Sequence, residues 1–185
     1  MKTSIKAALI FALIWIITVM SIYLLGYSVD LFRPVELFGL FTLLGAVFTG
    51  LFLTKKEQGY DERPALDDFK VGMQSGLLYT IIITSFIYVY HETIDPSIRE
   101  SMIQDRIMAI NEQVPDNATY QKMQELDPTW KDKSFDDYIE NQEIQTRSFI
   151  SAKFTALIHL FVLFMFSLFY SFFVTIVIRK VILRQ

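Results

Sequence analysis

The chain has 185 residues, of which 52% are hydrophobic, more than an ordinary soluble domain of this size contains, while 20% are charged. The 20 acidic residues outnumber the 17 basic ones, and the resulting net charge of -3 argues against a general nucleic-acid-binding surface. Cysteine is absent, which excludes disulfides, thiolate metal sites and a cysteine nucleophile.

Four segments contain no Lys, Arg, Asp or Glu: residues 7–29, 37–54, 71–90 and 154–178. Each has about the 17 to 25 residues that a helix needs to cross a bilayer. The first segment is too long for the apolar part of a signal peptide and ends without a small-x-small cleavage site, so we expect it to be retained. The sequence therefore predicts an all-α integral membrane protein with four transmembrane helices. Three of them occupy residues 1–90, an extramembrane insertion occupies residues 91–153, and the fourth helix with a basic tail occupies residues 154–185.

The basic residues predict how the chain is oriented. Lys2 and Lys6, then Lys55, Lys56, Arg63 and Lys70, and finally Arg179, Lys180 and Arg184 all flank one side of the predicted helices, whereas the short segment on the other side contains only Arg33. Lys and Arg in short loops favour the cytoplasmic side. We therefore expect a multi-pass protein of a bacterial inner membrane, with both termini in the cytoplasm and residues 91–153 in the periplasm.

The insertion is acidic, and its pattern is helical. Asp95 followed by Pro96 predicts a helix start, and Val114-Pro115 predicts its end. Between them Ile98, Met102, Ile107, Ile110 and Val114 form one apolar stripe, of which we expect Ile98, Met102 and Ile107 to bind a partner. A shorter helix is predicted to end at Leu126-Asp127-Pro128. Ser134-x-x-Asp137 predicts a capping box, and the absence of Gly and Pro after it predicts one long rod that continues into the last membrane helix.

Small residues recur at helical spacing in the second and third predicted spans. Such residues let helices pack closely in lipid. We expect these residues to pack against other helices of the same chain rather than to form a dedicated dimer interface. The two stripes are Gly39, Thr42, Ala46 and Thr49 in the second span, and Gly72, Gly76, Thr80 and Thr84 in the third.

Three polar residues near the outer ends of the spans are candidate functional residues: His91, Glu92 and His159. His159 lies inside a span, where a neutral histidine hydrogen-bonded to a neighbouring helix is favoured over a proton relay. No carboxylate lies inside any predicted span. A metal site that combines both histidines with Glu92 or Asp95 is less favoured, because no His-Glu-x-x-His or comparable spacing is present.

Three short motifs carry a family resemblance: Gly59-Tyr60, Phe69-Lys70-Val71-Gly72 and Ile94-Asp95-Pro96. In their order and spacing the chain resembles the small four-span membrane proteins of Bacteroidota grouped as domain of unknown function 4199. The resemblance implies the four-helix arrangement but no activity and no catalytic residues.

The sequence contains no nucleophile elbow, phosphate-binding loop or dinucleotide fingerprint, so we expect no enzyme, cofactor or metal. The leading hypothesis is a non-catalytic accessory or assembly protein that contacts the lipid bilayer and either a membrane-protein partner or a second copy of itself. The alternative is a small transporter or channel for a small or lipid-like solute, and a membrane-embedded enzyme comes third.

Overall fold

A computed structural model of the chain describes residues 2–60, 64–126, 130 and 133–181. Every regular element in the described part is helical. In chain order the elements are α1 (Thr3–Leu24), α2 (Phe32–Glu57), α3 (Ala65–Val89), the π-helix η1 (Tyr90–Ile94), α4 (Ser97–Gln113), α5 (Asn117–Leu126), α6 (Phe135–Phe149) and α7 (Ala152–Val181). Arg63, Asp127, Pro128 and Arg184, which entered the predictions, lie outside the described residues.

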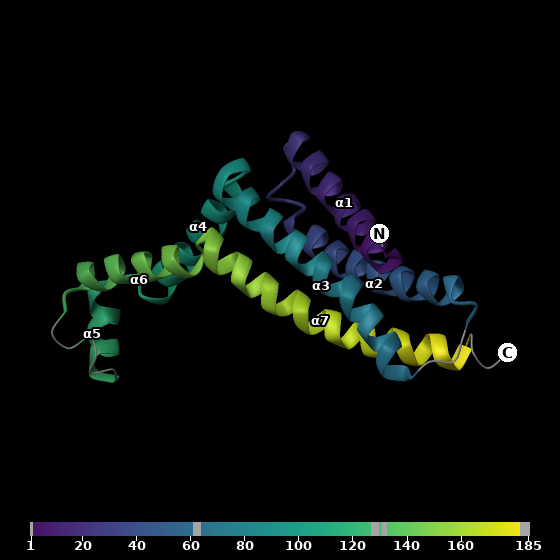
Figure 1. Ribbon diagram of the computed structural model, residues 1–185. Coiled ribbons are helices and arrows are strands. Elements are labelled where there is room, and N and C mark those ends of the chain that lie inside the picture. The colour runs from purple at the N-terminus through teal and green to yellow at the C-terminus, as the bar shows by residue number, and fades with distance from the viewer. Residues whose placement is uncertain (1, 61–63, 127–129, 131–132, 182–185) are drawn as a thin grey trace.

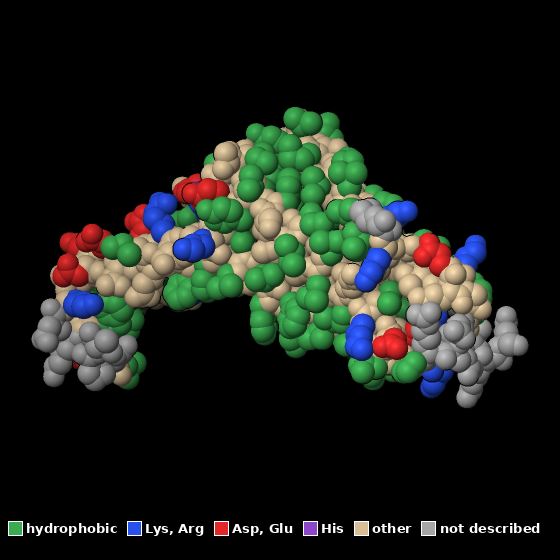
Figure 2. All heavy atoms as spheres, in the orientation of Figure 1, with side chains coloured by type: hydrophobic (Ala, Val, Ile, Leu, Met, Phe, Trp, Pro, Cys, Tyr) green, Lys and Arg blue, Asp and Glu red, His purple; other side chains and the backbone are tan. Residues whose placement is uncertain are grey.

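Four helices of the described chain are long and apolar enough to cross a membrane: α1, α2, the continuous helix of α3 and η1, and α7. They overlap the four uncharged segments of the sequence and pack into one bundle, in which α3 lies against α7 and α1 lies against α2 (Figure 1). On the face shown in Figure 2, charged side chains gather on the projecting arm and at the opposite end, and the zone between them is apolar. This distribution indicates a multi-pass membrane protein.

Two glycines end the first two membrane helices. Gly26 has φ +79° and follows α1, whereas Gly59 has φ +66° and follows α2. The left-handed backbone at such positions costs glycine little, so the chain turns where a helix would otherwise continue. This explains why α1 ends at Leu24 although the uncharged segment runs to residue 29.

The segment between η1 and α7 forms an arm of three helices that projects from the bundle (Figure 1). The predicted end of the first arm helix and the predicted capping box are confirmed: α4 ends at Gln113, and Ser134 and Asp137 cap α6 reciprocally. The predicted end of the next helix, at Leu126-Asp127-Pro128, falls where the described residues stop. The arm has its own apolar cluster, separate from the core of the bundle. Buried in this cluster are Ile110, Val114, Tyr120 and Tyr138, with Met123, Trp130, Phe135 and Ile139 packed around them.

The predicted continuous rod after Phe135 is wrong, because the chain breaks between α6 and α7. Helix α6 ends at Phe149, and α7 begins at Ala152 in a different direction (Figure 1). The hydroxyl oxygen of Ser151 accepts a hydrogen bond from the backbone N–H of Phe154 at 3.3 Å. Ser151 therefore starts a new helix as an N-cap, and neither Gly nor Pro is needed for the break.

The predicted partner-binding stripe on α4 also needs correction. Ile98 is 4% exposed and belongs to the core of the membrane bundle, so it cannot contact a partner. Ile103, which the stripe did not include, is buried as well, whereas Met102 is 41% exposed and Ile107 is half-buried. The stripe is therefore divided, because the start of α4 packs back onto η1 and the bundle.

Candidate binding site

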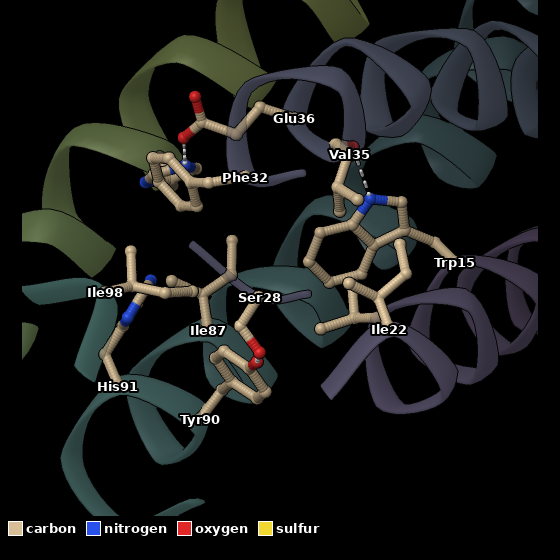
Figure 3. A pocket seen from close by; sticks show the side chains of 12 residues that line it. Trp15, Ile22, Ser28, Phe32, Val35, Glu36, Ile87, Tyr90, His91 and Ile98 are labelled. Carbon is tan, nitrogen blue, oxygen red and sulfur yellow. Dashed lines mark hydrogen bonds and ion pairs between the residues drawn. The ribbon is translucent and has the colours of Figure 1, made fainter. Parts of the chain in front are cut away.

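A small cavity of about 40 Å³ lies at the end of the bundle where α3 passes into η1, and we call this the η1 end. Figure 3 shows that the lining side chains converge from several helices, with Glu36 and His91 on opposite sides. The lining residues are Trp15, Val19, Ile22, Ser28, Phe32, Val35, Glu36, Ile87, Tyr90, His91, Ile98 and His159.

Glu36 and His159 form a polar pair that joins α2 to α7. The Nε2 atom of His159 lies 2.9 Å from Oε1 of Glu36, and its Nδ1 lies 2.9 Å from the backbone oxygen of Thr155. Because a carbonyl oxygen only accepts, Nδ1 carries a hydrogen. The contact with Glu36 then needs one further proton, either on Nε2 beside a carboxylate or on the carboxyl beside a neutral ring. In both cases the pair shares one proton and is neutral overall, which suits a position inside a predicted membrane span.

His91 faces the same cavity from η1. Its side chain is 5% exposed, and its Nδ1 has no hydrogen-bond partner among the described residues. Tyr90, beside it, is also buried, whereas Glu92 is exposed and lies 3.3 Å from Arg99 through its Oε2. The wider turn of a π-helix is frequent at functional sites. Here the π-helix η1 forms the end of the third membrane helix, and both Tyr90 and His91 are buried in it.

A chain of hydroxyl groups links η1 to the start of α4. The Tyr90 hydroxyl donates to Oδ2 of Asp95 at 3.1 Å and lies 3.3 Å from the hydroxyl of Ser28. Oδ1 of Asp95 accepts from the backbone N–H of Ser97 at 3.1 Å and from its hydroxyl. Burial of Asp95 opposes ionisation, but the hydrogen bonds from Ser28, Ser97 and Tyr90 outweigh it and hold the pKa of Asp95 below its ordinary value. Asp95 thus fixes the exit from η1.

A larger cavity of about 480 Å³ lies between α2 and α7 and shares Trp15, Glu36, Ile87 and His159 with the small one. Its volume falls within the roughly 300 to 1,000 Å³ of ordinary ligand pockets. The remaining lining residues are Arg33, Leu37, Gly39, Leu40, Ile83, Ile158, Val162 and Leu163. We call this cavity the α2–α7 groove. Most of its lining is apolar, and Arg33, Glu36 and His159 form its one polar end.

Of the three polar candidates, the structure brings His91 and His159 to one cavity and places Glu92 away from it. Among the described residues no group of three His, Asp or Glu side chains is arranged to hold a metal ion. The sequence reasoning missed Glu36, which lies in the second turn of α2. Pro34 was the available signal, because proline is tolerated in the first turn of a helix and indicates a start before residue 37.

The two small-residue stripes lie at contacts between helices of the same chain. A Cβ added at Gly72 would lie 3.2 Å from the Cβ of Ser171, and one at Gly76 would lie 2.9 Å from the Cβ of Ser167, both on α7. A Cβ at Gly39 would meet the indole nitrogen of Trp15 at 2.9 Å. Of the other predicted members, Thr42, Ala46 and Thr80 are buried, and Thr49 and Thr84 are half-buried.

A second polar cluster, which the sequence reasoning also missed, joins three helices at the opposite end of the bundle. Asp68 at the start of α3 pairs through Oδ1 with Nζ of Lys55 at 2.7 Å. Its Oδ2 pairs with Nη1 of Arg179 at 2.9 Å. The side chains of Lys55 and Asp68 are only 1% and 5% exposed. This cluster therefore fixes the ends of α2, α3 and α7 relative to one another.

Comparison with known proteins gives one match. The profile of a family described as protein of unknown function (DUF4199) matches residues 6–180. Neither the curated proteins nor the solved structures contain a match to the chain.

Proposed function

The chain belongs to the DUF4199 family of proteins of unknown function, and because that description assigns no activity, we propose a function from the structure. The protein is a non-catalytic accessory or assembly protein of a bacterial inner membrane, and its arm binds a partner. The partner is another membrane protein or a second copy of the chain. The proposal includes no catalysis. In the small cavity and the α2–α7 groove the one lining serine is Ser28, which hydrogen-bonds to Tyr90 and Asp95 rather than to a histidine.

The proposed orientation follows from charge. Lys55, Lys56, Arg179 and Lys180 lie in the last turns of α2 and α7, at the same end of the bundle as the start of α1. Positive charge in short connections favours the cytoplasm. The termini are then cytoplasmic, and the arm and the η1 end are periplasmic.

The observation that carries the proposal is that the arm is built as a folded unit with its own apolar cluster. A segment that only connected two membrane helices would need no such cluster. The arm also leaves apolar side chains exposed, among them Met102 at 41%, Met108 at 56% and Ile144 at 61%. Methionine adapts to varied surfaces and is frequent where proteins bind partners.

The test is affinity purification of the full-length protein, expressed together with a differently tagged second copy, in a mild detergent at native expression level, followed by quantitative mass spectrometry. The expected result is a stoichiometric partner with the wild type and a loss of most of it with the double variant Met102→Ser and Met108→Ser. The control is Gln104→Ser with Asp105→Ser, which replaces exposed polar residues on the same helix. Equal recovery with both double variants, or no stoichiometric partner at all, contradicts the proposal.

A second candidate function is transport of a small or lipid-like solute, and the α2–α7 groove favours it. Apolar side chains that line the groove are exposed at the surface of the bundle, as Leu37 is at 60%. The groove ends at the Glu36–His159 pair. Flux assays in proteoliposomes test this function. Solute movement above that of empty vesicles supports it, and movement equal to the background contradicts it for each solute tried.

A further inference from the structure

The α2–α7 groove has the shape and chemistry of a site for one lipid molecule. Its long walls are aliphatic, and Leu37, Ile158 and Val162 are 60%, 47% and 39% exposed. On the outside of a membrane bundle these side chains contact acyl chains.

The polar end of the groove carries a guanidinium group and a carboxyl group, both on α2. Arg33 and Glu36 are three residues apart, a spacing that places side chains on the same face of a helix with Cβ atoms about 5–6 Å apart. Arg33 is exposed and makes no ion pair with another described residue, and Glu36 uses only Oε1 for His159. A guanidinium fork and a carboxylate oxygen are thus available side by side.

We propose that the groove binds one phospholipid whose headgroup contains a phosphate and a primary ammonium, the phosphatidylethanolamine class. Arg33 binds the phosphate, and Oε2 of Glu36 accepts a hydrogen bond from the ammonium. One acyl chain lies along Leu37, Leu40, Ile158 and Val162. Arginine suits phosphate because its planar fork matches phosphate oxygens.

The charges select this headgroup over the other common ones. A glycerol headgroup provides no cation for Glu36, and a choline headgroup has no N–H to donate to it. The small inner cavity of about 40 Å³ has room for water and none for a headgroup, so His91 is not a ligand of the lipid.

This inference shares with the proposed transport function only the location of the site, the α2–α7 groove. It does not require the protein to move a solute. Lipid binding and solute flux are separate measurements, so one can fail while the other succeeds.

The test is native mass spectrometry of the full chain in a non-ionic detergent, with phosphatidylethanolamine, phosphatidylglycerol and phosphatidylcholine of identical acyl chains. We expect the wild type to bind the ethanolamine lipid about tenfold more tightly than either of the others, which corresponds to about 1.4 kcal/mol. Glu36→Gln should make the three affinities equal, whereas Glu112→Gln on the arm should change nothing. Equal binding by the wild type, or an unchanged preference in Glu36→Gln, overturns the proposal.

Two tryptophan variants locate the site. Val162→Trp fills the groove and should reduce the binding of all three lipids, whereas Phe161→Trp, which adds the same ring outside the lining, should leave binding unchanged. If Val162→Trp does not fold, Leu37→Trp blocks the groove from α2 instead. Wild-type lipid binding by a folded, groove-filling variant overturns the location.

Discussion

Substitution of Gly76 by alanine should separate α3 from α7. The new Cβ would lie 2.9 Å from the Cβ of Ser167 and 3.2 Å from Cγ2 of Val47, and the hydroxyl of Ser167 would be nearer still. Rotation of the Ser167 hydroxyl removes only part of the overlap, because its Cβ is fixed by the backbone of α7. Overpacking of this kind costs about 1–3 kcal/mol, while alanine in place of glycine gains up to about 1 kcal/mol in a helix interior. We expect a net loss of about 1–2 kcal/mol in the free energy of unfolding.

The assay is unfolding in mixed micelles followed by far-UV circular dichroism, with Gly72→Ala and Ser167→Gly as companions. Gly72→Ala should cost less, since its nearest contacts, with Ser171, are 3.2 to 3.3 Å. In the double variant of Gly76→Ala with Ser167→Gly, the overlap with the Ser167 side chain is absent and only the 3.2 Å contact with Val47 remains, so the double variant should be more stable than the sum of the two single changes predicts. Additive effects, or a Gly76→Ala protein as stable as the wild type, would refute the close seam between α3 and α7.

Three further predictions concern polar groups. Asp68→Ala removes the buried carboxylate that pairs with both Lys55 and Arg179 and should lower the free energy of unfolding by about 1–3 kcal/mol, whereas Asp67→Ala at an exposed neighbour should change it by less than about 0.5 kcal/mol, both measured in mixed micelles. Because the pKa of Asp95 is lower in the folded state, its contribution to stability is present above about pH 3.8, the ordinary pKa, and is lost as the pH falls through the folded pKa. Unfolding measured between pH 6 and pH 3 should therefore show a steeper acid loss for the wild type than for Asp95→Asn. Ser134→Ala removes the capping box and should destabilise α6 by about 1 kcal/mol, seen as faster amide exchange in that helix only.

The sequence predicts the helices of this fold well where a local run or pair of residues is enough to set where a helix lies or starts. Runs without charge coincide with the membrane helices, and Ser134 with Asp137 predicts the start of α6. Ser151 was not predicted as a helix start, because a single serine inside a helical pattern is common and its role depends on the backbone around it. The break between α6 and α7 therefore appears only in the structure.

The candidate site was only partly predictable, because it depends on pairing across the fold. A rule that ends a span at the first charge treats Glu36 as outside, although His159 neutralises it from a position 123 residues later in the chain. The same rule treats Lys55 as an exposed flank, although Asp68 holds it at 1% exposure. Sequence shows that a residue is charged, but only the tertiary contacts show whether its partner lies beside it.

The two polar clusters and the small-residue seam together explain why the groove lies where it does. At one end Asp68 holds α2, α3 and α7 together, and in the middle Gly76 lets α3 approach both Val47 and Ser167 closely. Toward the η1 end, packing between α2 and α7 is replaced by one hydrogen-bonded pair, Glu36 with His159, above a cavity of about 480 Å³. The η1 end is therefore the part of the bundle best suited to admit a ligand, and the arm begins directly beside it at Ile98.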